Sequence, residues 1–184
     1  MSILKKAIFL DKDGTLIHNV HYNVDPQKIR LTDGAIEGLK KLIDADYELY
    51  IISNQQGVAL NYFTEKDLVP VKEKIEEMVS IHGVLISGFY YCPHHTNDNC
   101  VCRKPQPKLI KDAAQDHNLD LANSWMIGDM PTDIVAGKKA GCKTIFFDNG
   151  LKNDWQFAKD ENPDHIVKSL DEAADYILDK NKGY

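Results

Sequence analysis

The residues best suited to chemistry in this sequence are two carboxylates separated by one residue. Asp11 and Asp13 follow directly after the apolar run Ala7–Leu10, and Gly14 comes next. One carboxylate of such a pair can attack phosphorus as a nucleophile, while the other acts as general acid and then as general base. Gly14 permits a sharp turn that brings backbone amides close to an anion. The structural alternative is an Asp-Gly turn that simply ends a strand.

Two further pairs of residues have the chemistry to hold a phosphate group. Ser53 and Asn54 follow the apolar run Glu48–Ile52 and offer a hydroxyl with neighbouring backbone amides, although such a pair is commonly a turn or a cap. Arg103 and Lys104 offer positive charge, although an isolated basic pair is usually solvated surface. An ammonium group held among carboxylates neutralises a phosphoryl group and limits its repulsion from Asp11.

A second pair of acids follows another apolar run later in the chain. Asp129 comes two residues after the run Trp125–Ile127, and Asp133 lies four residues further on. Asp129 can ligate a hard divalent cation such as Mg²⁺, and Asp133 can orient a metal-bound water or pair with Lys104. The structural alternative is that Asp129 caps a helix and Asp133 is an acid of its first turn.

Three of the four cysteines lie in one short polar segment. Cys92, Cys100 and Cys102 together with one imidazole are sufficient to close a tetrahedral structural zinc site. His94 and His95 compete for the fourth position. In a reducing compartment this spacing favours metal ligation over disulfides, and a loop this polar has little else to fold around.

Short apolar runs alternate with helical patterns, which predicts the elements that position these residues. We expect strands over 7–10, 48–52, 88–91, 125–127 and 144–147. We expect helices around 36–43 and 71–79, and over 108–117, 132–140 and 170–178. The pattern predicts an α/β fold: a doubly wound, Rossmann-like parallel sheet with helices on both faces. The polar residues at the strand ends, Asp11, Ser53, Cys92 and Asp129, are then expected to converge.

The chain shows no linker or repeat, so residues 1–184 are predicted to form a single domain. The segment from Leu16 to Asp33 is too short for a separate lid, so no large cap domain is expected. The one sizeable insertion is the zinc loop at about 92–107. Pro70 falls where a helix beginning after Thr64 would already be under way, which predicts a kink or a restart.

Composition excludes several classes of partner. The formal net charge is -6, and 43% of the residues are hydrophobic and 27% charged. Nucleic acid and anionic membrane both require a basic surface, so neither is an expected partner. No apolar stretch approaches the roughly 18 residues of a membrane span, and no secretory signal is evident, which favours the cytoplasm.

The ordered set of Asp11-Lys12-Asp13-Gly14-Thr15, Ser53-Asn54, Lys104 and Gly128-Asp129 with Asp133 resembles the haloacid dehalogenase superfamily of phosphotransferases. The resemblance runs from about Ala7 to Gly150. It implies that Asp11 forms an aspartyl-phosphate, that Asp13 protonates the leaving oxygen and then activates water, and that Ser53, Asn54, Arg103 and Lys104 bind phosphate. It also implies that Asp11, Asp129 and the backbone carbonyl of Asp13 hold Mg²⁺.

The cysteine segment narrows the resemblance to a branch of small phosphatases that act on heptose bisphosphate or histidinol phosphate. C-x-H followed by C-x-C is similar to that branch, which selects His94 over His95 as the fourth zinc ligand. Arg103-Lys104-Pro105 and Gly57-Val58-Ala59 are more similar to the heptose enzymes. The resemblance therefore implies hydrolysis of the 7-phosphate of D-glycero-D-manno-heptose 1,7-bisphosphate. Separately, we expect the chain to act as a monomer.

Two alternatives and one question stay open at this point. The alternatives are a histidinol-phosphate phosphatase and a non-catalytic module that accepts phosphate at Asp11 or interacts through its zinc loop. The question is how a second phosphate would be bound. Leu60-Asn61 stands where the heptose enzymes often carry Arg-Gly, and Met130 stands where many carry a basic residue. Arg103, Lys12 and Lys108 are candidates for the missing positive charge.

Overall fold

The strands of the chain form one parallel sheet. The computed structural model describes residues 4–151, 155, 157–159 and 161–181. Within them the sheet has six strands in the order β3-β2-β1-β4-β5-β6, and every paired neighbour is parallel. The strands are β1 Lys6–Leu10, β2 Tyr47–Asn54, β3 Ile86–Cys92, β4 Trp125–Gly128, β5 Lys143–Phe147 and β6 His165–Val167.

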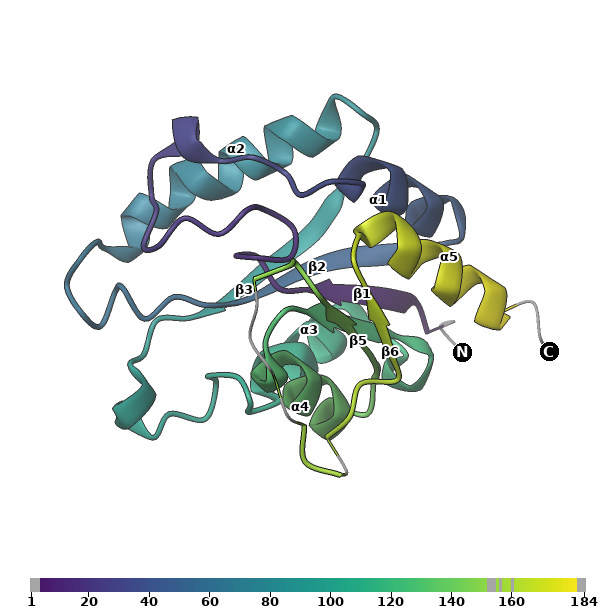
Figure 1. The fold of residues 1–184 in the computed structure, drawn as a ribbon. Helices are drawn as coiled ribbons and strands as arrows, with labels where there is room; N and C mark the ends of the chain where they lie inside the picture. The colour runs from purple at the N-terminus through teal and green to yellow at the C-terminus, as the bar shows by residue number, and fades with distance from the viewer. Residues whose placement is uncertain (1–3, 152–154, 156, 160, 182–184) are drawn as a thin grey trace.

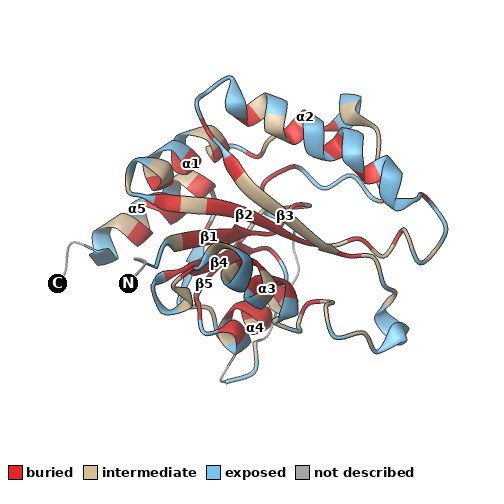
Figure 2. Ribbon diagram, turned by 180° about the vertical axis from the view of Figure 1, so that it is seen from behind, coloured by how far each residue is buried: buried red, intermediate tan, exposed pale blue. Residues whose placement is uncertain are grey.

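Helices cover both faces of the sheet, as Figures 1 and 2 show. The helices are α1 Ala35–Asp44, α2 Leu68–Ser80, α3 Lys108–His117, α4 Pro131–Ala140 and α5 Leu170–Asn181. Buried residues of α1, α2 and α5 pack with one face of the sheet, and those of α3 and α4 pack with the other. The predicted α/β class and helix placement are therefore confirmed.

The central strand β1 supplies both hydrophobic cores. Ile8 and Leu10 point into the core beneath α1, α2 and α5, whereas Ala7 and Phe9 point into the core beneath α3 and α4. Successive side chains of a strand alternate between faces, so a strand covered on both sides must be apolar at every position. This requirement explains why β1 reads as an uninterrupted apolar run.

The strand order creates a crevice beside β1. From β1 the chain moves outward to β2 and then β3, and it returns to place β4 on the opposite side of β1. Connections that diverge from two adjacent strands leave a gap beyond their carboxyl ends. That gap lies directly after Leu10 of β1 and Gly128 of β4, where the sequence has Asp11 and Asp129.

Two details differ from the sequence-based expectations. The strand β6 was not predicted, because it is three residues long and only Val167 of it is buried. The helix α2 begins at Leu68, after a 3-10 turn over Glu65–Asp67. Pro70 therefore lies in the first turn of α2, where a backbone N–H would have no helical partner.

Two long loops reach the carboxyl edge of the sheet. Residues 11–34 connect β1 to α1 with a 3-10 turn at Pro26–Lys28, and residues 93–107 connect β3 to α3 with a 3-10 turn at Thr96–Asp98. Among the described residues no helix is both long enough and apolar enough to cross a membrane.

The crossing of α1 and α5 gives a test of the packing. A Cβ on Gly38 would overlap the backbone carbonyl of Leu170 at the start of α5. Gly38→Ala would gain roughly 1 kcal/mol of helix propensity, yet overpacking against backbone is expected to outweigh this gain. We predict that the free energy of unfolding falls by about 1–3 kcal/mol in urea titrations.

The control for this prediction is Lys40→Ala, because Lys40 is an exposed residue of the same helix. It should change the free energy of unfolding by less than about 0.5 kcal/mol. Equal or greater stability of Gly38→Ala would contradict the close approach of the two helices.

Candidate active site

Three aspartates from distant parts of the chain meet at the crevice between β1 and β4. The backbone N–H of Asp11 donates to the carbonyl of Ile127 over 2.9 Å, which extends the β1–β4 pairing and brings the two strand ends together. One carboxylate oxygen each from Asp11, Asp129 and Asp133 lie within 4.8 Å of one another, and all three residues are buried. This spacing allows Asp11 and Asp129 to bracket a single cation.

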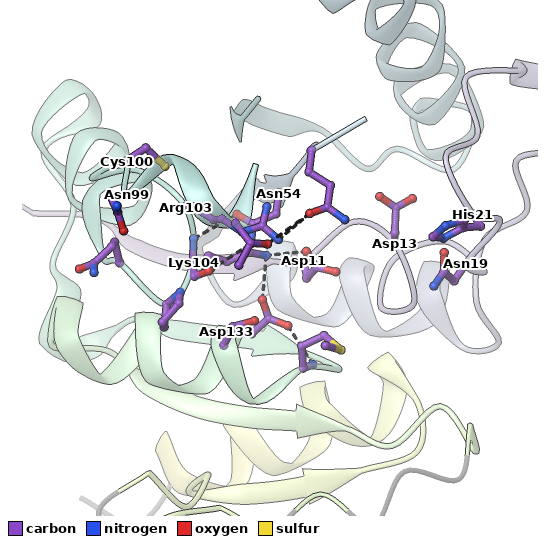
Figure 3. Close-up of a pocket in the computed structure, with 16 residues that line it drawn as sticks. Asp11, Asp13, Asn19, His21, Asn54, Asn99, Cys100, Arg103, Lys104 and Asp133 are labelled. Carbon is purple, nitrogen blue, oxygen red and sulfur yellow. Dashed lines mark hydrogen bonds and ion pairs between the residues drawn. The ribbon is translucent and has the colours of Figure 1, made fainter. Parts of the chain in front are cut away.

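The ammonium group of Lys104 lies between two of these carboxylates (Figure 3). Its Nζ is 2.5 Å from Oδ1 of Asp11 and 2.7 Å from Oδ1 of Asp133, and it donates to the carbonyl of Ile52 over 2.7 Å. Lys104 is only 3% exposed. Burial alone would lower the pKa of Lys104, but the charges of Asp11 and Asp133 outweigh burial and raise it. Lys104 is therefore held as a cation.

One cation does not balance three buried carboxylates. Burial raises the pKa of Asp11 well above its usual value, in opposition to the charge of Lys104. Burial, followed by repulsion from Asp133, raises the pKa of Asp129 to about 6. Both pKa shifts arise mainly from burial, with a further contribution from the neighbouring carboxylates. A hard divalent cation prefers such clustered oxygen ligands. The donor set therefore fits Mg²⁺.

The side chain of Asp129 is held in place from two sides. Thr15 Oγ1 donates to its Oδ1 over 3.3 Å, and Asn149 Nδ2 donates to its Oδ2 over 3.0 Å. Gly14 has a φ of 92°, and a Cβ there would overlap the carboxylate of Asp129. Glycine is needed at this position because both the turn and the close approach exclude a side chain.

Asp13 stands apart from the carboxylate cluster. Its Oδ2 accepts a hydrogen bond of 2.9 Å from Gln55 Nε2 and lies 3.3 Å from Nζ of Lys12. Gln55 Nε2 also donates to Ser53 Oγ over 2.7 Å. Ser53 is buried and is linked to Asp13 through Gln55, and Asp13 itself lines the pocket above the cluster.

Asn54 fixes the backbone of Lys104. Its Nδ2 donates to the Lys104 carbonyl over 3.2 Å, and its Oδ1 accepts from the Lys104 N–H over 3.0 Å. The sequence suggests a phosphate ligand at this position, whereas the structure finds both ends of the amide occupied by the neighbouring loop. Asn54 therefore anchors the segment that delivers Lys104 to the crevice.

A pocket of about 570 Å³ opens over Asp11 and Asp13. One wall comes from the loop of residues 93–107, which contributes Arg103. The opposite wall includes His21, from the loop that follows β1, and Figure 3 shows His21 on the far side of Asp13 from Lys104. A polar ligand of sugar size fits in this space.

The predicted zinc ligands lie together. One atom each from Cys92, His94, Cys100 and Cys102 are within 4.8 Å of one another. Cys92 Sγ lies 3.0 Å from Cys102 Sγ and 3.6 Å from Cys100 Sγ, and His94 Nδ1 lies 3.3 Å from Cys102 Sγ. Tetrahedral zinc thiolates have sulfur atoms roughly 3.8 Å apart, so the cluster fits zinc.

Two predictions about this segment can be compared with the structure. His95 stays outside the cluster, because its Nδ1 accepts a hydrogen bond from the Asn97 N–H over 3.2 Å. Cys92 ends β3 as expected, but it belongs to this second cluster and does not join Asp11 and Asp129. The cluster lies at the base of the loop that carries Arg103 and Lys104.

Several contacts at the site were not assigned from the sequence. Asn149 Nδ2 donates both to Asp129 and to the Gly14 carbonyl, the latter over 3.1 Å. Asn149 lies two residues after β5, at the same sheet edge as Asp129. The strand-end rule that selects Asp11 and Asp129 would therefore have found Asn149. Thr15 belongs to the motif that begins at Asp11, and Gln55 follows Ser53-Asn54, but neither residue was assigned a role of its own from the sequence.

Comparisons with known proteins agree with this arrangement. A family model described as HAD-hydrolase-like matches residues 101–173, which include Lys104, Asp129 and Asp133. The chain is 39% identical over 146 residues to a D-glycero-beta-D-manno-heptose-1,7-bisphosphate 7-phosphatase of Pasteurella multocida, covering 76% of this chain and 79% of that protein. It is 34% identical over 180 residues to the enzyme of the same name from Helicobacter pylori, covering 96% and 99%.

A solved structure of a heptose bisphosphate phosphatase is also similar to this chain. The D,D-heptose 1,7-bisphosphate phosphatase of B. bronchiseptica, complexed with magnesium and phosphate, superposes with a TM-score of 0.83 at 26% identity, and the match covers 95% of this chain and 99% of that one. The chain belongs to the HAD-like phosphatase family that contains the heptose-1,7-bisphosphate 7-phosphatases.

The buried ion pairs of Lys104 give a test of the site. Lys104→Met keeps the length of the side chain but removes its charge, so Asp11 and Asp133 become buried and unpaired. We predict a loss of about 3–5 kcal/mol in the free energy of unfolding, measured by urea titration at neutral pH without divalent metal.

The control is Lys108→Met, four residues along the chain. Lys108 is exposed, and its ion pair within the described part of the chain is with Asp112 on the same helix. This variant should therefore change the free energy of unfolding by less than about 0.5 kcal/mol. If both variants proved equally stable, Lys104 would not be the counter-ion of the cluster.

Proposed function

We propose that the chain is a Mg²⁺-dependent phosphomonoesterase that removes the 7-phosphate of D-glycero-D-manno-heptose 1,7-bisphosphate through a phospho-aspartate at Asp11. The observation that carries this proposal is the cluster of Asp11, Asp129 and Asp133 around the Lys104 ammonium at the floor of an open polar pocket. Full-length similarity to relatives with this named activity supports the substrate.

In the first step, a carboxylate oxygen of Asp11 attacks the phosphorus atom and the bond from phosphorus to the sugar oxygen breaks. Asp13 gives its proton to that oxygen, so that the sugar leaves as an alcohol. The hydrogen bond from Gln55 holds one oxygen of Asp13 and leaves the other for the pocket. In the second step, Asp13 takes a proton from water, the water attacks phosphorus, and the bond to Asp11 breaks to release phosphate.

Positive charge at the floor of the pocket makes these steps possible. Lys104 lies against the nucleophile and is positioned to neutralise the phosphoryl oxygens, with Ser53 as a further residue that binds them. Asn54 contributes by holding the backbone of Lys104, and Arg103, on the pocket wall, is a phosphate-binding residue farther from Asp11. Asp11, Asp129 and the backbone carbonyl of Asp13 would hold Mg²⁺. When bound, the cation supplies charge neutralisation and orientation of the phosphoryl group. Asp133 orients Lys104 through their ion pair.

We also propose that Cys92, His94, Cys100 and Cys102 hold a structural zinc ion. Three thiolates and one imidazole leave no open coordination position for a reaction. The zinc would fix the end of the loop that carries Lys104. Thiols stay reduced in the cytoplasm, which is where we expect the enzyme to act, as a monomer on a small sugar phosphate.

The nucleophile gives the central test of this function. Asp11→Asn removes the attacking oxygen anion, so release of phosphate from the heptose bisphosphate in the presence of Mg²⁺ should fall by more than about 1,000-fold. The fold should persist, because a neutral amide removes a buried charge. Far-UV circular dichroism and the melting temperature check this point, and turnover by the variant at the wild-type rate would refute the assignment.

The matched control is Asp112→Asn, which removes a carboxylate from the exposed face of α3. It should leave turnover unchanged. Histidinol phosphate is assayed beside the heptose bisphosphate, and a higher kcat/KM for histidinol phosphate would assign the chain to the alternative activity. No turnover by the wild-type chain on any small phosphate ester would favour a non-catalytic module.

The zinc proposal is tested by metal content. The purified chain should carry a single zinc ion per molecule, and Cys100→Ser should lose it and melt at a lower temperature, because the loop then lacks its anchor. Cys142→Ser is the control for metal content. Cys142 is buried elsewhere, where burial raises its pKa to about 12. Full zinc occupancy in Cys100→Ser would exclude this ligand set.

A further inference from the structure

Few positively charged side chains of the pocket are available to bind a second anionic group of a substrate. Lys104 is already bound to Asp11 and Asp133. Lys12 faces Asp13 and does not line the pocket, and Lys108 lies exposed on α3. Among the described residues that line the pocket, Arg103 is therefore the cation left over.

The guanidinium of Arg103 is held by two acceptors. Its Nη2 donates to Oε1 of Gln56 over 3.2 Å, and its Nη1 donates to the carbonyl of His94 over 3.3 Å. A long arginine side chain loses conformational entropy when it is fixed in one rotamer. Because these two hydrogen bonds already restrict the side chain of Arg103, less conformational entropy is lost when a substrate binds to it. Arg103 is therefore partly preorganised over the pocket.

Gln56 also contacts the loop on the other side of the pocket. Its Nε2 donates to the hydroxyl of Tyr22 over 3.0 Å, and its Oε1 accepts a second hydrogen bond, of 3.4 Å, from Thr96. The ring of Tyr22 packs edge-on against Tyr62, with 4.7 Å between centroids. One carboxamide thus joins the loops of residues 18–25, 55–63 and 93–107.

The hydrogen bonds that Gln56 and Arg103 already make within the protein show which of the two has groups left to bind a substrate. Both acceptor sites of Oε1 and one N–H of Gln56 are used within the protein, so a single N–H is left for a ligand. Arg103 by contrast retains several N–H groups, and a guanidinium can bind phosphate through two of them at once. Gln56 is therefore suited to hold Arg103, and Arg103 to contact the substrate.

We propose that Gln56 is a positioning residue that sets specificity: it fixes Arg103 and couples it to Tyr22, so that the pocket favours a substrate with a second phosphate over the matching monophosphate. This inference rests on the proposed phosphatase function and deepens it. The scissile phosphate depends on Lys104 and the aspartate cluster, so a change at Gln56 should act on the remote end of the substrate alone.

The experiment uses Gln56→Met, which preserves side-chain length and removes all three hydrogen bonds. KM and kcat are measured with heptose 1,7-bisphosphate and with heptose 7-phosphate, which share the scissile ester. We expect KM for the bisphosphate to rise about 10-fold, as for a lost hydrogen bond to a charged group. We expect kcat for both substrates and KM for the monophosphate to stay unchanged.

A double-mutant comparison tests whether Gln56 affects KM through Arg103. Arg103→Met alone should raise KM for the bisphosphate at least as much as Gln56→Met does. Arg103→Met combined with Gln56→Met should be no worse than Arg103→Met, because Gln56 acts through Arg103. Additive effects, or an equal rise in KM for both substrates, would overturn the proposal. Gln115→Met, the same substitution on the exposed face of α3, serves as the control.

A measurement without turnover separates this inference from the proposed function. The side-chain ¹⁵N signals of Arg103, assigned by their loss in Arg103→Met, should be dispersed in the wild-type chain and averaged in Gln56→Met. Unchanged signals would overturn the positioning role. If the wild-type chain hydrolysed neither heptose phosphate, the proposed function would fail and the specificity role with it, whereas the signals would still report whether Gln56 holds Arg103.

Discussion

The arrangement of the site depends on one buried ammonium group. The aspartates that follow β1 and β4 are brought together by the sheet, and like charges at this distance repel strongly where water is excluded. Lys104 lies against Asp11 and Asp133 and makes their proximity tolerable. Its charge balances only part of the cluster, and burial together with repulsion from Asp133 raises the pKa of Asp129. A set of clustered carboxylate oxygens with this partial balance fits a divalent cation.

Lys104 comes from a loop, so the loop must be fixed as firmly as a strand. Two independent features accomplish this. Asn54, at the end of β2, holds the backbone of Lys104 through two hydrogen bonds, and the cluster of Cys92, His94, Cys100 and Cys102 closes the preceding segment on itself. A cluster of four potential metal ligands therefore takes the place of the regular secondary structure that residues 93–107 largely lack. In the proposed function, the loop contributes to the reaction indirectly, through the position of one ammonium group.

The sequence was sufficient to predict the features that follow local rules. Apolar runs of strand length located five of the six strands, and the residues just beyond them located Asp11 and Asp129. The spacing of the cysteines located the second cluster. Features that depend on long-range contacts were not predictable in this way. The strand β6 is too short and too exposed to give a pattern. Gln56 reads as an ordinary turn residue, because its contacts with Tyr22 and Arg103 cross 34 and 47 residues of sequence.

The two ends of the pocket obey different physical constraints. At the floor, Lys104 and the three clustered aspartates are buried, and a substitution among them leaves an uncompensated charge in a medium of low polarity. At the rim, the contacts of Gln56, Tyr22 and Arg103 lie between loops that are partly open to solvent, where the exchange of one hydrogen bond for another has little effect on the free energy of unfolding. Substitution at the rim can therefore alter which molecule enters without disturbing the groups that react with its phosphate. It follows that the chemistry of such a site is fixed by its core and its substrate by its loops.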